Sequence, residues 1–408
     1  MLKSSLGFHT MTLFLPLDTD KVCSLLCDFY KYSHDTGCII IETPYTAGYK
    51  ATTKLPETID EDRCFLLPLE TIIRYRRDTG IRWRIISKIR QQSFSTCMIE
   101  VKINPKILSG VQDYISAATY ADMETAIANF NREARKISSL LQDFSCYMLS
   151  RVDYCVNFSL NELAPECTPE QIINLIKRSD IPTSYKEWKT YDSASHRMKS
   201  KPGSFYLINN SIHINCYSKY MQLADQSQKN ELKGYQKVPQ RTLETAQDVI
   251  RFEVQCFYPK TYMLARKAEQ KGNDCLNKYE SLLDHIECID KVSEYYKKTV
   301  GFGDWYTLED AVKIVKNQHY NSQKERRLLD ALVFVNQCRS VAKAKAYYQG
   351  DALDIFKKTL KDLSALGINP VTIPKEWGIK HIPNLLNTYF NKVDDDRLKS
   401  GICFQYVT

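Results

Sequence analysis

The chain has 408 residues and a formal net charge of +8, from 56 Lys and Arg against 48 Asp and Glu. Its 43% hydrophobic and 25% charged residues are typical of a globular protein and argue against a disordered chain. No apolar run reaches the roughly 20 residues of a membrane helix, so no membrane partner is expected. The mild positive charge favours a polyanionic partner.

Residues 1–145 form the first predicted domain, in which strands and helices are mixed. The segment 7–15 alternates weakly between apolar and polar residues and predicts a strand. Because no signal-peptide cleavage site follows this segment, we expect a cytoplasmic protein. Residues 95–103 also predict a strand. Apolar residues at helical spacing predict helices over 18–32 and 120–143.

Residues 146–258 form the second predicted domain. Strands are predicted over 150–160 and 248–257, and a hairpin over 204–220 with Asn209 and Asn210 as its turn. A helix is predicted over 167–179, with Thr168 as N-cap. The order is βαββαβ, which predicts an α+β fold with a ferredoxin-like sheet. The loosely similar content of the first domain suggests an old duplication.

Residues 259–408 form a third, helical domain. The segment 322–348 predicts a helix, a short turn and a second helix that carries Lys343 and Lys345. This pattern permits a helix-turn-helix, in which the second helix enters the major groove of DNA.

Three predicted strands of the second domain share one design, an apolar face opposite a face with ionisable groups. Their polar faces carry Asp153, His213 and Tyr217, and Glu253. The usual strand order of a ferredoxin-like sheet is 4-1-3-2, which would place the first strand between the fourth and the third. Asp153, Glu253 and His213 would then meet and hold Mg²⁺ or Mn²⁺.

A tyrosine beside such a cation is a candidate nucleophile that attacks phosphorus. Tyr217 has this position, and Lys219 or Arg251 would lower its pKa and hold the phosphate. The alternative interpretation is that the alternating residues serve solubility alone, since antiparallel sheets commonly have one solvated face.

The segments "RVDYCVNF", "SFYLINNSIHINCYSKY" and "DVIRFEVQ" resemble the signature blocks of rolling-circle replication initiators. The similar group joins plasmid replication initiation factors with the gene II-type nicking endonucleases of filamentous phages. Its pattern is R-x-D on a strand, a hairpin that ends in Y-x-K, and R-x-E on a later strand. The matching residues here are Arg151 and Asp153, Tyr217 and Lys219, and Arg251 and Glu253.

The resemblance implies a metal-dependent tyrosine that nicks one DNA strand at an origin and stays attached to the 5′ phosphate. The free 3′-OH then primes synthesis by a host polymerase in a bacterial cell. Many nicking enzymes carry two histidines around one hydrophobic residue, whereas only His213 is found here. Tyr220 and Tyr206 are rival nucleophiles; the first would qualify if a helix begins at Ser218.

Single-stranded or cruciform origin DNA is the expected partner. Residues 184–204 mix basic and aromatic side chains in a predicted loop, where cations contact phosphate and aromatic rings stack on unpaired bases. The candidate DNA-binding residues are Arg151, Lys186, Trp188, Arg197, Lys343 and Lys345.

Two other functions remain open from the sequence. One is a regulator that binds origin DNA without cutting it, and the other is a conjugative relaxase. The chain has no phosphate-binding loop of the G-x-x-x-x-G-K-[ST] type, so unwinding would require a host helicase.

Overall fold

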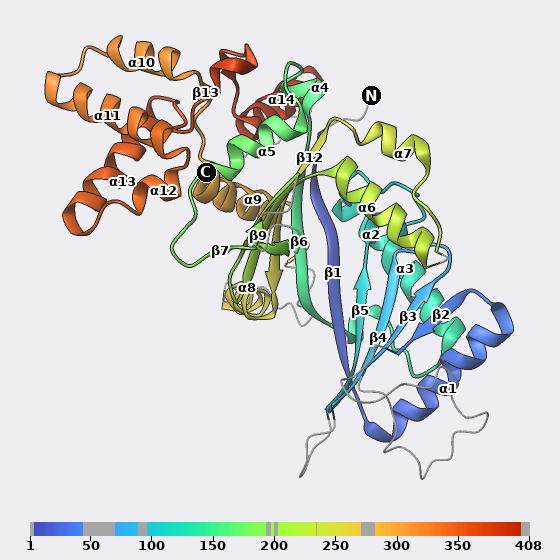
Figure 1. The fold of residues 1–408 in the computed structure, drawn as a ribbon. Coiled ribbons are helices and arrows are strands. Elements are labelled where there is room, and N and C mark those ends of the chain that lie inside the picture. The colour runs from blue at the N-terminus through green and yellow to red at the C-terminus, as the bar shows by residue number, and fades with distance from the viewer. Residues whose placement is uncertain are drawn as a thin grey trace.

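The computed structural model describes residues 4–43, 70–88, 96–192, 197–199, 203–233, 235–270 and 282–400. Within these ranges, ten strands form one sheet in the order β2-β3-β4-β5-β1-β6-β12-β11-β10-β7 (Figure 1). All neighbouring strands of this sheet are antiparallel. A large antiparallel sheet with helices packed on it agrees with the predicted α+β class.

The first half of the sheet comes from the N-terminal part of the chain. Its elements are β1 (Ser5–Leu17), α1 (Thr19–Thr36), β2 (Ile39–Glu42), β3 (Glu70–Tyr75), β4 (Ile81–Lys88), β5 (Thr96–Ile103), α2 (Pro105–Leu108) and α3 (Tyr120–Ile137). The strands predicted over 7–15 and 95–103 and the two predicted helices are confirmed.

The second half begins after a short 3-10 turn, η2 (Phe144–Cys146). Its elements are β6 (Met148–Ser159), α4 (Leu160–Leu163), α5 (Pro169–Lys177), β7 (Lys186–Glu187), β10 (Ser204–Ile208), β11 (Ile212–Ser218), α6 (Lys219–Leu232), α7 (Gln240–Thr245) and β12 (Val249–Phe257). A separate two-stranded ribbon pairs β8 (Thr190–Asp192) with β9 (Arg197–Lys199). The predicted N-cap of α5 is confirmed, since Thr168 accepts a hydrogen bond from the backbone N–H of Gln171.

The strand order of this half differs from the ferredoxin-like order predicted from the sequence. The structure has the order β6-β12-β11-β10, so the fourth strand lies between the first and the third. The predicted order instead placed the first strand between the fourth and the third. The predicted order would have paired the first and third strands in parallel. The observed order keeps every pair antiparallel, a pairing that is slightly more stable per residue. As a result, His213 and Tyr217 of β11 face β12 instead of β6.

Outward from the central β1–β6 pair, both halves show the same descending order. One side reads β1, β5, β4, β3, β2, and the other reads β6, β12, β11, β10, β7. In each half the first strand therefore pairs with the last long strand. Such an order is what a duplication would leave, and the duplication itself stays a prediction. The sheet continues across residue 145, because β1 pairs with β6.

The two faces of the sheet are covered differently. On the apolar face, Trp83 of β4 contacts Phe29 of α1, and Phe252 of β12 contacts Tyr296 of α9 (His285–Thr299). On the opposite, polar face, α2 and α6 cover only part of the sheet through a small apolar cluster that includes Ile107 and Leu223. Two hollows lie on this face of the sheet.

The remaining described part of the chain is mostly helical. Its first two helices pack against the sheet, and most of the helices that follow extend away from it (Figure 1). Its elements are α8 (Tyr258–Gln270), α9, β13 (Trp305–Tyr306), α10 (Leu308–Lys316), α11 (Ser322–Cys338), α12 (Val341–Lys345), α13 (Gly350–Ala365), η3 (Lys375–Trp377), β14 (His381–Ile382) and α14 (Leu385–Ser400). The second helix of the predicted helix-turn-helix is α12, which has only five residues. Among the described helices, none has both the length and the apolar character needed to span a bilayer.

Candidate metal centre

A β-bulge in β1 turns two consecutive side chains toward the polar face. The pairing of β1 with β6 shifts register between Phe8 and Met11. His9 and Thr10 therefore lie together opposite the single residue Asp153. Bulges of this two-against-one kind re-aim side chains and are common beside active sites. Both residues line the same cleft on the polar face.

The two carboxylates of the site come from adjacent strands. Asp153 of β6 lies directly opposite Gln255 of β12, so Glu253 is its diagonal neighbour on the same face. One ligand atom each from His9, Asp153 and Glu253 can be chosen so that all three lie within 4.8 Å of one another. The structure thus brings together the two carboxylates proposed from the sequence and adds a histidine from β1.

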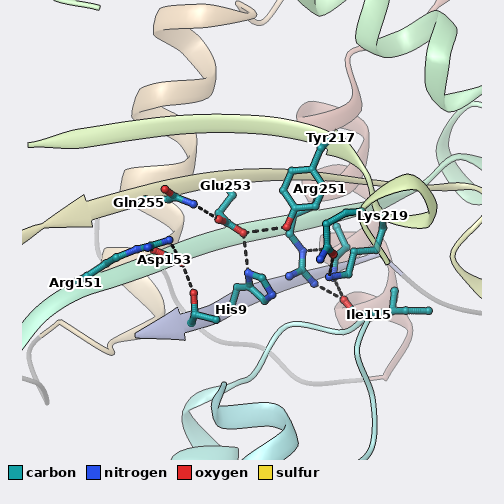
Figure 2. A network of polar contacts seen from close by, with 12 residues as sticks. His9, Ile115, Arg151, Asp153, Tyr217, Lys219, Arg251, Glu253 and Gln255 are labelled. Carbon is teal, nitrogen blue, oxygen red and sulfur yellow. Dashed lines mark hydrogen bonds and ion pairs between the residues drawn. The ribbon is translucent and has the colours of Figure 1, made fainter. Parts of the chain in front are cut away.

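Hydrogen bonds fix the orientation of both carboxylates (Figure 2). Arg151 donates from Nε to Oδ1 and from Nη2 to Oδ2 of Asp153, both at 2.7 Å, and the Thr10 hydroxyl also donates to Oδ2. Glu253 contacts Nδ1 of His9 through Oε2 at 2.8 Å and accepts from Nε2 of Gln255 through Oε1 at 2.5 Å. The two groups are therefore held in place before any ligand arrives.

The protonation states suit a cation site. Burial, together with the positive charge of Arg251, lowers the pKa of His9 to about 3, so the imidazole is neutral at neutral pH. Burial raises the pKa of Asp153, and the negative charge of Glu253 adds to this rise although Arg151 opposes it. Burial would also raise the pKa of Glu253, but the contact with His9 and the charge of Arg251 outweigh it and lower the pKa.

These residues fit a divalent cation. A neutral histidine that donates its Nδ1 proton to a carboxylate keeps the lone pair of Nε2 for a metal. Two carboxylates supply the oxygen ligands that Mg²⁺ and Mn²⁺ prefer, and Mn²⁺ also accepts imidazole. His9, Asp153 and Glu253 are thus the residues that could hold such an ion.

A tyrosine hydroxyl lies beside this group. Tyr217 of β11 donates a hydrogen bond to Oε2 of Glu253 at 3.2 Å (Figure 2), and its side chain is only 6% exposed. Burial raises the pKa of the Tyr217 hydroxyl well above its usual value, and Glu253 raises it further. Arg251, which faces Tyr217 across the β11–β12 pair, acts in the opposite direction.

Two buried basic side chains, Arg251 and Lys219, lie near the tyrosine. Arg251 is fully buried, donates from Nε to Oδ1 of Asn157 at 2.7 Å and from Nη2 to the carbonyl of Ile115, and its Nη1 lacks a hydrogen-bond partner among the described residues. Lys219, only 1% exposed, donates to Oε1 of Gln222 at 2.9 Å. Burial lowers the pKa of Lys219 well below its usual value, and the charge of Arg251 adds to this effect.

The structure places His213 apart from the three clustered ligands. His213 lies opposite Gln255, and its Nδ1 contacts the hydroxyl of Tyr206 at 2.8 Å. The cause is the strand order, because β12 lies between His213 and Asp153. Tyr206 lines the same cleft as Tyr217. Tyr220 is 39% exposed in the first turn of α6, a helix that begins directly after Ser218.

The other candidate DNA-binding residues are dispersed. Arg151 lies at the metal centre, where it pairs with Asp153. Lys186 is exposed on β7, and Trp188 is 51% exposed at the rim of the cleft. The side chain of Arg197 on β9 lies outside the described side chains. On α12, Lys343 is exposed, whereas Lys345 forms a 2.5 Å ion pair with Asp180.

The cleft that contains the site has a volume of about 610 Å³. Its floor is the polar face of the second half of the sheet, and α6 borders it through Met221, Gln222 and Asp225. Tyr206 and Trp188 line its far side. Tyr217 and the two carboxylates line this cleft, and their side chains are almost completely buried.

Sequence reasoning missed His9 and Thr10. A signal for them exists in β1, where the buried apolar residues change parity from Leu6 and Phe8 to Met11 and Leu13. Such a change within one strand indicates a bulge, because strand side chains otherwise alternate with a period of two.

No protein-family model and no curated protein sequence matches the chain. Among solved structures, the chain is similar to one described as the rolling circle replication initiator protein from Geobacillus stearothermophilus. The TM-score is 0.29 and the identity 8%, over 71% of this chain and 96% of that chain. A likeness this loose carries no argument about function.

Proposed function

We propose that this chain is a replication initiator that nicks one strand of origin DNA, with Tyr217 as the nucleophile. The observation that carries the proposal is the hydrogen bond from the Tyr217 hydroxyl to Glu253, which belongs to the His9, Asp153 and Glu253 group. A tyrosine oxygen next to a set of cation ligands, at the bottom of an open cleft, suits phosphoryl transfer.

In this reaction the Tyr217 oxygen attacks a phosphorus atom of the DNA backbone, and the bond from phosphorus to the 3′ oxygen breaks. The phosphate stays on the tyrosine as a 5′-phosphotyrosine link. The proton of the phenol, which Oε2 of Glu253 accepts in a hydrogen bond, is balanced by the proton that the leaving 3′ oxygen takes up. The free 3′-OH then primes DNA synthesis by host enzymes.

His9, Asp153 and Glu253 would hold Mg²⁺ or Mn²⁺ for this reaction. When bound, the cation polarises a phosphate oxygen and offsets the charge that develops on the phosphoryl group. Arg251 supplies a fixed positive charge next to the tyrosine oxygen, which favours its phenolate form. Trp188 and Tyr206, on the far side of the cleft, offer ring faces on which unpaired bases can stack.

The test is covalent trapping. Wild-type protein, Mn²⁺ and a labelled single-stranded oligonucleotide from the intergenic DNA of the protein's own genetic element should give a protein–DNA adduct that survives denaturation. Tyr217→Phe should abolish the adduct, because no oxygen remains to attack, whereas Tyr220→Phe and Tyr206→Phe should keep it. EDTA should prevent adduct formation by the wild-type protein.

Each other result overturns a specific part of the proposal. An adduct in Tyr217→Phe assigns the nucleophile to another residue. An adduct that forms in EDTA excludes the metal ion. The small exposure of Tyr217 favours one alternative function, a regulator that binds origin DNA without cutting it. Specific origin binding by the wild-type protein with no adduct would establish that function instead.

A further inference from the structure

Three basic residues form a row across the first half of the sheet. Arg74 of β3 lies directly opposite Arg82 of β4, which in turn lies directly opposite Lys102 of β5. Because partners in register share one face, the three side chains rise from the same surface. We call Arg74, Arg82 and Lys102 the cation row. Thr12 of β1 continues it, and Arg151 of β6 lies opposite Thr12.

The charges of the cation row are poorly compensated. Within the described ranges, Arg74 forms a single, long ion pair with Glu42, at 3.8 Å, and its guanidinium lies over the ring of Tyr235. Among the described residues, no carboxylate forms an ion pair with Arg82 or Lys102. Like charges directly opposite each other destabilise a sheet. The cation row should therefore lower the stability of the fold.

Two residues further along the same strands, the charges are balanced. Arg84 lies opposite Glu100 and forms ion pairs with Glu70 at 2.5 Å and with Glu100 at 3.2 Å. The same strands thus neutralise one arginine with two carboxylates and leave the next row without them. An unneutralised row of this kind is typical of a surface that binds an anion.

The cation row borders a hollow that opens into the metal centre. This hollow has a volume of about 310 Å³ and is lined by all three residues of the row. It shares four lining residues with the cleft of the metal centre, namely His9, Thr10, Lys102 and Gln222. On its other side lies α6, through Gln222, Gln226 and Asn230. A pocket of this size is on the scale of a small ligand and too narrow for a duplex.

We propose that the cation row binds the sugar–phosphate backbone of the single DNA strand that runs through the metal centre. This inference rests on the proposed nicking function. Neighbouring strands lie about 4.8 Å apart, so the path from Arg74 to Arg151 crosses four strand spacings, or about 19 Å. The DNA strand would then contact cations over the first half of the sheet and aromatic rings over the second half.

The test measures binding without cleavage. A fluorescein-labelled oligothymidylate of about 20 nucleotides is titrated with protein in EDTA, and anisotropy is followed at several salt concentrations. The variant Arg82→Gln/Lys102→Gln should bind about tenfold more weakly, and the slope of log K against log salt should become shallower by about 1.4, since each lost phosphate contact contributes about 0.7. Lys358→Gln/Lys361→Gln on α13 is the control, because both lysines are exposed and the change in net charge is identical.

A second measurement separates binding from folding. Removal of unneutralised cations should leave the melting temperature of the DNA-free protein unchanged or raise it. Weaker binding together with a lowered melting temperature would overturn the proposal, because the row would then be structural. An unchanged salt slope in Arg82→Gln/Lys102→Gln would also overturn it. The same holds for an equally large loss of affinity in the α13 control, or for a loss of affinity for duplex DNA with none for the single strand.

The outcome is independent of the nicking reaction. Binding in EDTA reports on the cation row, and adduct formation in Mn²⁺ reports on Tyr217 and the metal centre. If the wild-type protein binds the oligonucleotide through the row but forms no adduct, the nicking function fails and the backbone contact remains. If it forms the adduct and the row variant binds normally, only the inference about the row fails.

Discussion

The two halves of the sheet present the same strand order and the same polar face, yet they treat charge in opposite ways. In the second half, opposite charges meet at hydrogen-bond distance, as Arg151 and Asp153 do at 2.7 Å. In the first half, Arg82 and Lys102 face each other across a strand pair without a carboxylate partner among the described residues. The second half therefore pairs the charges around Asp153 within the fold, and the first half leaves one row of cations without such a pairing.

This difference shows that an alternating strand pattern does not predict which charged residues are neutralised, because that depends on the register between strands. Charged residues on the polar faces of β4, β5 and β6 stand in similar alternating sequences, among them Arg82, Arg84, Glu100, Lys102, Arg151 and Asp153. Whether such a residue is neutralised depends on its partner on the next strand. Arg84 faces a glutamate and Arg82 faces a lysine, although the two lie only two residues apart.

The largest expected contrast between the halves is in stability. Arg251→Met should lower the free energy of unfolding by about 3 kcal/mol, because it leaves the buried Oδ1 of Asn157 without a donor and removes one of the two donors to the carbonyl of Ile115. Arg82→Met, the matched change in the first half, should stay within about 0.5 kcal/mol of the wild type or exceed it. Chemical denaturation of both variants measures this; equal losses would remove the distinction between the two halves.

The next contrast concerns the metal ion. At about 100 times its dissociation constant, Mn²⁺ should stabilise the wild-type protein by about 2.7 kcal/mol, seen as a rise in melting temperature. Glu253→Gln should lose this rise, since it removes one of the three ligands. Glu100→Gln changes a glutamate on the same face of the first half and should keep it. Retention of the rise in Glu253→Gln would show that the ion binds elsewhere.

Much of the fold could be predicted from the sequence because its signals are local. The N-cap Thr168 is followed by Pro169 and an apolar period, and α5 begins there. The hairpin of β10 and β11 was also predictable, although its turn includes Ser211 besides the two asparagines. The strand order was not predictable, because it depends on which pairings are most favourable over the whole sheet. No residue of β12 shows by itself whether β6 or β11, or both, will be its neighbour.

The residues of the candidate site could likewise be predicted only in part from the sequence. Asp153 and Glu253 were found from the sequence because each stands on the polar side of a strand that alternates clearly. His9 was missed because the bulge breaks the alternation of β1, so the weak pattern of residues 7–15 predicts a strand but not its polar face. His213 was selected instead because its strand alternates well, and only the strand order separates it from Asp153.

The smallest expected effect distinguishes cations with an ion pair from cations without one, because salt should change the stability of their variants in opposite directions. Salt at about 1 M shortens the screening length to about 3 Å, less than the distance between neighbouring strands. It should relieve the repulsion in the cation row and weaken the pairs around Arg84. Relative to the wild type, Arg82→Gln/Lys102→Gln should therefore gain less stability from KCl, and Arg84→Gln should gain more, each by about 0.5 kcal/mol. Both variants remove positive charge from the same face of the sheet, so an effect of net charge alone would shift their unfolding free energies in the same direction. Opposite shifts require that the register, and not the composition, decides which cations of this face are left for a ligand.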